Sequence, residues 1–189
     1  MELQNMREVP YGVSDFMTVR RDNLYYVDKT MYLPILEKES RNLFFIRPRR
    51  FGKSIFISML HAYYDIRQKD SFDTLFGGLW VGKHPTPLHN RFQVLHLDFS
   101  QVGGNVERLE EKFDFYLGVQ LDGFVRDYGE YYGEQFANRI RETKDGTDKL
   151  TIITTEAKSR TIPSTSSSTN TTTSRIPCST SGERKCIGT

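Results

Sequence analysis

Apolar residues in the first 150 positions recur at two spacings, and each spacing predicts a different kind of element. Repeats of three or four residues are typical of amphipathic helices, whereas short unbroken apolar runs of strand length are typical of buried strands. Ser14 or Asp15 is placed to cap the first helix, Asp28 the second and Asn105 a long one. The expected helices cover residues 17–21, 31–36, 53–67, 72–79, 105–128 and 129–141.

Three apolar runs predict strands: Leu24–Val27, Leu43–Ile46 and Phe92–Phe99. Leu43–Ile46 has no polar alternation, which is typical of a parallel strand that is covered on both faces. A buried strand, a loop, a helix and a further strand in this order indicate an α/β fold. We therefore expect the parallel sheet of a P-loop NTPase, flanked by helices and incomplete.

The composition changes sharply near residue 150. Every Phe, Tyr and Trp lies in residues 1–150, whereas nearly half of residues 151–189 are Ser or Thr. A segment with so few large apolar groups does not offset the entropy of ordering its backbone. We therefore expect a folded domain over residues 1–150 and a disordered Ser/Thr-rich tail over residues 151–189.

The tail has a second interpretation, in which a change of reading frame produced it. Residues 168–174 can be encoded TCG ACG AAT ACG ACA ACT TCN. Shifted back by one nucleotide, with A as the preceding base, this reads Ile-Asp-Glu-Tyr-Asp-Asn-Phe. An apolar strand that ends in Asp-Glu has the form of a Walker B segment. The hypothesis places one lost base, or two gained, between about Lys144 and Thr161; a genuine Ser/Thr-rich linker or tail is the alternative.

Charge and hydropathy exclude some classes of protein. With 26 basic and 24 acidic residues, the net charge of +2 does not indicate a nucleic-acid coat protein. No run approaches the 18 or so apolar residues of a membrane-spanning helix. The first residues show no basic stretch followed by an apolar run, and Cys178 and Cys186 form no disulfide framework. We therefore expect a cytoplasmic protein that does not span a membrane.

The strongest chemical signal is a variant P-loop between the strand predicted at Leu43–Ile46 and the helix predicted from Lys53. In a P-loop, backbone N–H groups at a helix N-terminus surround the phosphates, the Lys ammonium reaches the terminal phosphates, and the Ser hydroxyl ligates Mg²⁺. The pattern predicts binding of ATP and Mg²⁺, with Ser54 as a metal ligand. The loop reads Arg47-Pro48-Arg49-Arg50-Phe51-Gly52-Lys53-Ser54.

Several positions around the loop leave alternatives open. Arg47 replaces the usual first glycine, although Arg resists a positive φ. Arg49 and Arg50 could contact phosphate or pair with acidic groups of neighbouring elements. Asp98 follows an apolar run and is a weak candidate for the magnesium ligand or a catalytic carboxylate. Its alternative role is to close a turn at the end of the strand, because Phe99 follows where many ATPases have Glu.

Four separated segments resemble the bacterial predicted AAA-ATPase (AAA-ATPase-like) family over about residues 8–145. They are Tyr11-Gly12-Val13-Ser14-Asp15-Phe16, Tyr26-Val27-Asp28-Lys29-Thr30, Phe44 to Ser54, and Leu97-Asp98-Phe99-Ser100. The resemblance implies ATP and Mg²⁺ binding through Lys53 and Ser54, with Arg49 and Arg50 in the loop. It also implies a following nuclease-like domain with a PD-(D/E)XK motif, and through it a DNA partner. That domain and the Asp-Glu segment are both missing from this chain.

These features predict an ATP-binding P-loop domain of a truncated or inactive ATPase. Losing the carboxylate that positions Mg²⁺ and water removes contributions typically worth several kcal/mol of barrier. Two alternatives stay open at this point. One is a basic nucleic-acid-binding fragment that uses Arg47, Arg49, Arg50 and Lys53 and does not hydrolyse nucleotides; the other is a pseudogene product without activity.

The frame hypothesis predicts that the nucleotide sequence across codons 140–189 contains an open neighbouring frame with apolar residues followed by Asp-Glu. Resequencing that stretch of the gene is the measurement. If neither neighbouring frame encodes an apolar-Asp-Glu segment, the Ser/Thr-rich tail is a genuine part of the protein.

Overall fold

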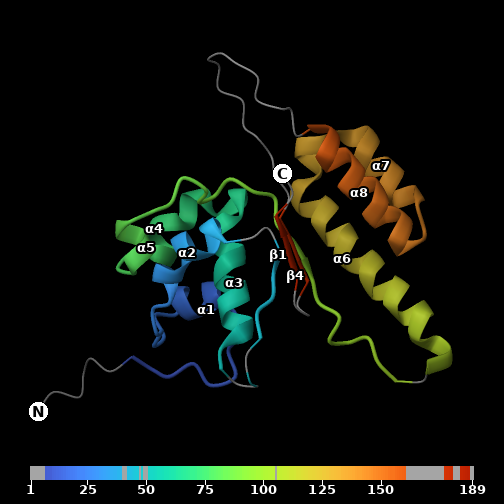
Figure 1. The fold of residues 1–189 in the computed structure, drawn as a ribbon. Helices are drawn as coiled ribbons and strands as arrows, with labels where there is room; N and C mark the ends of the chain where they lie inside the picture. The colour runs from blue at the N-terminus through green and yellow to red at the C-terminus, as the bar shows by residue number, and fades with distance from the viewer. Residues whose placement is uncertain are drawn as a thin grey trace, which may run out of the picture. The chain divides into compact units, whose positions relative to one another are not determined.

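The computed structural model describes residues 7–39, 42–46, 48, 51–104, 106–160, 177–180 and 184–187. It divides into two compact units, residues 1–92 and residues 93–189 (Figure 1). The division falls ahead of the strand around Leu95. Arg47, Arg49, Arg50 and Asn105, for which the sequence made predictions, lie outside the described residues.

The first unit consists of short helices and turns around α3 (Lys53–Tyr64). The other elements are α1 (Phe16–Arg21), the 3-10 turn η1 (Thr30–Tyr32), α2 (Leu33–Lys38), β1 (Asn42–Leu43), the 3-10 turn η2 (Ile66–Ser71), α4 (Phe72–Phe76) and α5 (Trp80–Lys83). Helices α3 and α4 both contact α1. Phe16 stacks on Phe76 with ring centroids 5.1 Å apart, and Met59 and Tyr63 of α3 are fully buried.

Asp15 both begins α1 and joins it to α3. Its carboxylate accepts a hydrogen bond from the Thr18 N–H at 2.8 Å and another from the Ser58 hydroxyl at 2.8 Å. The Ser58 oxygen in turn accepts the Phe16 N–H at 2.9 Å. The predicted cap at Asp15 is therefore confirmed, and the same side chain fixes α1 against the middle of α3.

Asp65 ends α3 earlier than the sequence predicted. The apolar spacing suggested a helix to about Arg67, but α3 ends at Tyr64 because Asp65 is extended, with φ −66° and ψ 122°. The buried Asp65 carboxylate accepts the Arg67 N–H at 2.9 Å and the Arg67 guanidinium at 3.0 Å, and it lies 3.4 Å from the His61 ring. The backbone then turns to pair with Phe92, whose N–H donates to the Tyr64 carbonyl oxygen at 2.9 Å.

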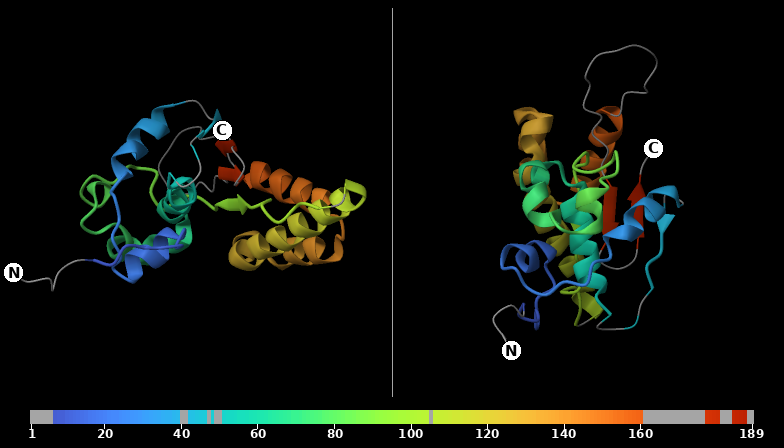
Figure 2. Two further views of the ribbon diagram at one scale, coloured as in Figure 1. Left: turned by 90° about the horizontal axis from the view of Figure 1, so that it is seen from below. Right: turned by 90° about the vertical axis from the view of Figure 1, so that its left-hand side faces the viewer.

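The second unit is built on the long helix α6 (Leu109–Tyr132), which α7 and α8 contact along its side (Figures 1 and 2). The buried face of α6 includes Leu117, Leu121, Phe124 and Tyr128. The remaining elements are β2 (Leu95–Leu97), the 3-10 turn η3 (Val106–Arg108), α7 (Glu134–Glu142), α8 (Gly146–Arg160), β3 (Pro177–Thr180) and β4 (Arg184–Ile187).

Helix α8 crosses the composition change at residue 150 without interruption. Its first residue, Gly146, lies so close to α6 that an added Cβ would be 2.7 Å from the Asp114 carbonyl oxygen. The Lys149 ammonium donates to the Asp122 carboxylate at 2.6 Å, and Ile153 is fully buried. The first ten residues of the segment expected to be a disordered tail are therefore part of this helix, and residues 161–176 lie outside the described residues.

The predicted fold class, a P-loop NTPase-like parallel sheet flanked by helices, is wrong. The described residues are predominantly helical, and their strands are two to four residues long. In the second unit, β2 pairs in parallel with β3, and β3 pairs antiparallel with β4, so this is no parallel sheet. The run Leu43–Ile46 was expected to be buried on both faces, yet Phe44 is 62% exposed and Ile46 is 78% exposed. Only Phe45 of this run stacks on α3, against Phe56.

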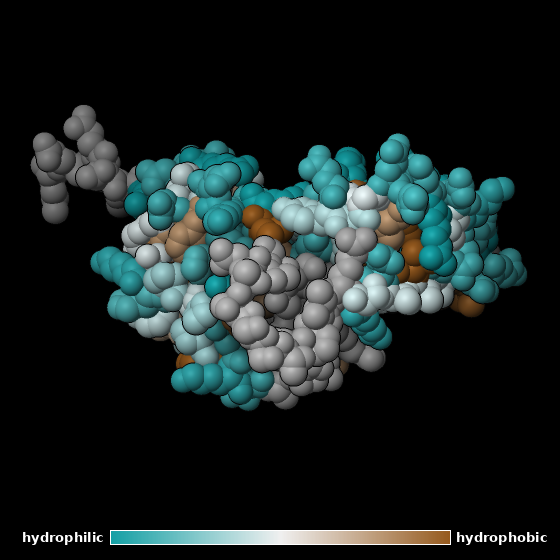
Figure 3. Space-filling model, turned by 90° about the horizontal axis from the view of Figure 1, so that it is seen from above, coloured by the Kyte–Doolittle hydropathy of each residue, from teal (hydrophilic) through white to brown (hydrophobic). Residues whose placement is uncertain are grey.

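Figure 3 shows one face of the molecule, on which hydrophilic residues predominate and hydrophobic residues form separate small patches. Among the helices that the structure describes, none combines the length and the apolar character needed to cross a membrane.

Asp65→Asn should lower the free energy of unfolding by about 2 kcal/mol at pH 7, because the buried carboxylate partner of Arg67 and His61 is lost. Burial raises the pKa of Asp65, but the hydrogen bonds from His61 and Arg67 outweigh burial and hold the pKa below its ordinary value of 3.8. A carboxylate with a lowered pKa stabilises the fold above its unfolded pKa, and this contribution is lost as the pH falls through the folded pKa. Urea unfolding from pH 7 to pH 3 should therefore show the gap between the two proteins narrowing below about pH 4.

Glu111→Gln is the matched control, because Glu111 pairs with Arg108 on the surface, where both side chains are well exposed. It should change stability by less than about 0.5 kcal/mol. A constant gap between wild type and Asp65→Asn across this pH range would contradict the assigned role of Asp65.

Candidate functional site

The predicted glycine, lysine and serine lie where α3 begins. Gly52 is the N-cap of α3 with φ 74° and ψ 25°, the left-handed conformation that glycine adopts without steric cost. The Phe56 N–H donates to the Gly52 carbonyl oxygen at 3.1 Å, which closes the first helical turn. A glycine has no side chain with which to cap the free N–H groups of that turn. The first turn therefore presents backbone donors and the positive end of the helix dipole to a ligand.

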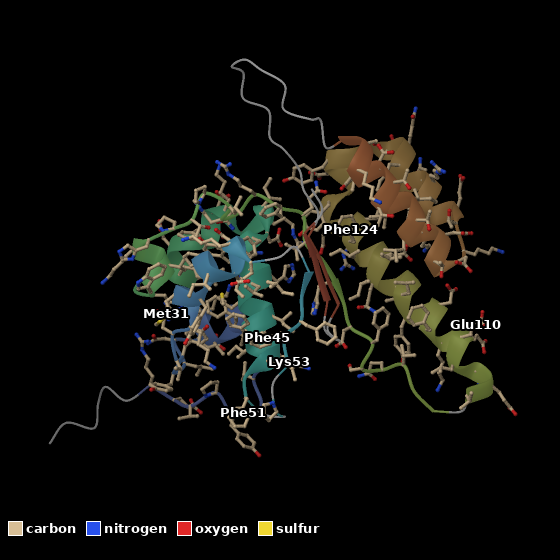
Figure 4. The ribbon with its side chains drawn as sticks, viewed as in Figure 1. Met31, Phe45, Phe51, Lys53, Glu110 and Phe124 are labelled. Atoms are coloured by element: carbon tan, nitrogen blue, oxygen red, sulfur yellow. The ribbon has the colours of Figure 1, made fainter. Side chains whose placement is uncertain are left out.

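Lys53 and Ser54 are the first two residues of α3, so the fold places both side chains at this helix end. Lys53 is half-buried and Ser54 is exposed. Phe51 lies near the N-terminal end of α3, below Lys53 in this view, whereas Phe45 lies beside α3 (Figure 4). Phe45 and Phe56 stack with ring centroids 5.1 Å apart, which attaches the segment before the loop to α3. Of the predicted loop residues, Phe51 to Ser54 are thus brought together at one helix end.

A residue that the sequence did not assign to the site lies at the same turn. A Cβ built on Gly52 would be 3.6 Å from the ammonium nitrogen of Lys29 and 3.4 Å from Cγ2 of Ile55. Lys29 belongs to the segment Tyr26–Thr30, which carried the family resemblance but no assigned chemistry. Because Lys29 lies far from the loop in the sequence, local patterns did not predict its place beside Gly52. Its membership of a shared motif was the only sequence signal for a role at the site.

Tyr26, in the same segment, has a packing role. Its ring meets that of Phe16 edge to face, with centroids 5.1 Å apart and planes at 72°. Burial raises the pKa of the Tyr26 hydroxyl well above its ordinary value, and the neighbouring Asp28 carboxylate raises it further. Tyr26 therefore stays protonated and fixes the start of this segment against α1.

Asp98, the candidate magnesium ligand, lies just after β2 in the second unit. Its carboxylate accepts the Ser100 N–H at 2.8 Å, and its backbone is held by Gln120, whose side-chain N–H donates to the Asp98 carbonyl oxygen at 2.9 Å. This is the turn-closing arrangement that the sequence offered as the alternative. A role of Asp98 in metal binding stays a prediction.

A family model described as "Predicted AAA-ATPase" matches residues 10–163. The chain belongs to this family. The match includes α3 and its N-terminal turn, Lys29, Asp98 and α8, and it continues past the composition change at residue 150.

One relative is the "Uncharacterized protein in vnfD 5'region" of Azotobacter chroococcum mcd 1, which is 34% identical over 110 residues. The aligned segment covers 54% of this chain but only 18% of the relative. The chain therefore spans less than a fifth of that protein's length. No solved structure matches the chain significantly.

Gly52→Ala should destabilise the first unit by about 1–2 kcal/mol, because alanine is disfavoured in the left-handed conformation. Gly118→Ala is the matched control: Gly118 lies within α6, and a Cβ there would have no neighbour within 4 Å. It should leave stability unchanged or raise it by up to about 1 kcal/mol. Equal urea midpoints for wild type and Gly52→Ala would contradict a left-handed Gly52.

Proposed function

We propose that this chain is an ATP-binding module of ATPase ancestry that holds nucleotide at the N-terminal turn of α3. The observation that carries the proposal is the left-handed Gly52 followed directly by Lys53 and Ser54 in a helix of twelve residues. Membership of the predicted AAA-ATPase family supports it. A basic nucleic-acid-binding fragment is the competing function, and the experiment below separates the two.

Each residue of the loop has a chemical role in this proposal. Gly52 turns the backbone so that the N–H groups of the first helical turn face the phosphates, which accept hydrogen bonds from them. The Lys53 ammonium neutralises the terminal phosphates, and the Ser54 hydroxyl is an oxygen donor suited to Mg²⁺. Magnesium, when bound, would neutralise phosphate charge. Arg49 and Arg50 belong to the proposed loop but lie outside the described residues.

We propose further that this form turns ATP over poorly or not at all. Hydrolysis needs a carboxylate that positions Mg²⁺ and a residue that orients water. The in-frame candidate, Asp98, is engaged with the Ser100 N–H. The exposed Phe44 and Ile46 support the idea that a segment which would cover them is missing. A change of reading frame remains our proposed cause.

The packing of α8 supports a proposed frame change that begins late in the range considered. Lys149 and Ile153 are buried against the rest of the second unit, as expected for a segment that belongs to the domain. The family match also continues to residue 163. We therefore place the proposed frame change after Ile153, in the later part of the range that the sequence allowed. A nuclease-like domain with a DNA partner, and a cytoplasmic location, are proposals on the strength of the family resemblance.

Lys53→Ala should weaken binding of ATP with Mg²⁺ at least roughly tenfold, equivalent to ~1.4 kcal/mol, because a charge-assisted contact to phosphate is lost. The affinity is measured by titrating the full chain with a fluorescent ATP analogue at fixed salt. Lys38→Ala is the control, since Lys38 is an exposed lysine at the end of α2, and it should bind as the wild type does.

Two results would contradict the proposal. Equal affinities of wild type and Lys53→Ala would remove Lys53 from the site. Preferential binding of duplex DNA, weakening steeply as salt rises, would favour the nucleic-acid-binding alternative.

A further inference from the structure

Hydrogen bonds of Asp28 and Thr30, the residues before and after Lys29, hold this segment in place. The Asp28 carboxylate accepts the Thr30 N–H at 2.8 Å and the Thr30 hydroxyl at 2.7 Å through one oxygen. Its other oxygen accepts the Trp80 N–H at 2.7 Å, at the start of α5. Thr30 is fully buried, and its hydroxyl oxygen accepts the Val81 N–H at 3.1 Å. The backbone on either side of Lys29 is therefore fixed against α5.

This anchoring aims the Lys29 side chain at the first turn of α3. The Lys29 ammonium nitrogen lies 3.6 Å from the Cβ position of Gly52, the residue that precedes Lys53. Asp28, its neighbour in sequence, already accepts hydrogen bonds from three other donors. Among the ion pairs formed by described residues, none involves Lys29 or Lys53.

Two separate segments therefore place positive charge at the N-terminus of α3, through Lys29 and Lys53. The N-terminus of α3 is already the positive end of the helix dipole, so a cation held there is disfavoured in the free protein. An anion bound at the turn would reverse this effect, because both the cation and the backbone donors would then interact favourably with it. A phosphate chain is an anion of the required charge, and it has enough oxygens to contact more than one donor.

We infer that Lys29 is a second phosphate-binding residue, which contacts the phosphate chain of ATP together with Lys53. The inference rests on the proposed function and adds to it. Lys53 is the first residue of α3, whereas Lys29 comes from the Tyr26–Thr30 segment and is positioned through Asp28 and Thr30. The contribution of Lys29 to the binding affinity increases with the number of phosphates on the nucleotide, because its ammonium interacts with phosphate charge and not with the base.

The test compares Lys29→Met, Lys29→Arg and Lys38→Met in the full chain, by titration with ATP, ADP and AMP in the presence of Mg²⁺. Methionine is an unbranched side chain only one atom shorter than lysine, and it removes the charge. Lys29→Met should weaken ATP binding roughly tenfold and AMP binding much less, because one charge-assisted contact to the outer phosphates is lost. Lys29→Arg should restore part of the ATP affinity, and Lys38→Met should bind as the wild type does.

Circular dichroism and the urea midpoint of each variant distinguish binding from folding. Equal losses for ATP, ADP and AMP together with a lowered urea midpoint would assign Lys29 a structural role and overturn the inference. Unchanged ATP affinity in Lys29→Met would also overturn it, and if Lys53→Ala still lost affinity the proposed function would stand. If the unaltered chain binds no ATP, the proposed function and this inference are both wrong.

Discussion

The left-handed conformation of Gly52 determines where α3 begins, and the candidate site depends on that one constraint. With φ at 74°, the chain enters the helix at a glycine, so the first turn has no side-chain cap. A Ser, Thr, Asp or Asn at this position would satisfy one of the free N–H groups with its own side chain. Glycine leaves these donors for a ligand.

The rest of the first unit holds α3 in position. Asp15 joins α1 to α3 through Ser58, and Asp65 ends the helix through a buried carboxylate that Arg67 and His61 contact. Asp28 performs a similar task for the Lys29 segment, which it fixes to the start of α5. Asp15 and Asp28 of two shared motifs, together with Asp65 at the end of α3, therefore act as hydrogen-bond acceptors that orient the backbone. Their role is to position the cations and donors near Gly52.

Helices α1, α4 and α6 were largely predictable from the sequence, because their caps or apolar stripes depend only on nearby residues, whereas α5 and α8 were not predicted. Asp15 caps α1 and Gly77 ends α4 as predicted, and α6 follows its apolar spacing. The sheet was not predictable in this way. An apolar run of four residues does not specify which neighbours will cover it, and Phe44 and Ile46 remain exposed because only Phe45 of that run stacks on a helix.

The site was predictable where its residues adjoin in sequence and was missed where they do not. Gly52, Lys53 and Ser54 follow a fixed spacing, so their common position at a helix end could be expected. The approach of the Lys29 ammonium to the Gly52 turn depends on the path of the chain through α2 and β1, which local patterns do not determine. The turn-closing role that the sequence offered for Asp98 was predictable from its place after an apolar run, and its carboxylate accepts the Ser100 N–H.

The most direct test of the account is the response of the backbone amides of Gly52, Lys53 and Ser54 to ATP with Mg²⁺, followed by ¹H–¹⁵N NMR of the full chain. We expect these three amides to show the largest chemical-shift changes, and to saturate together as nucleotide is added, because they donate to the phosphates. If the three amides stay unchanged while ATP binds elsewhere, or if saturating ATP perturbs no amide, nucleotide binding at the start of α3 is contradicted.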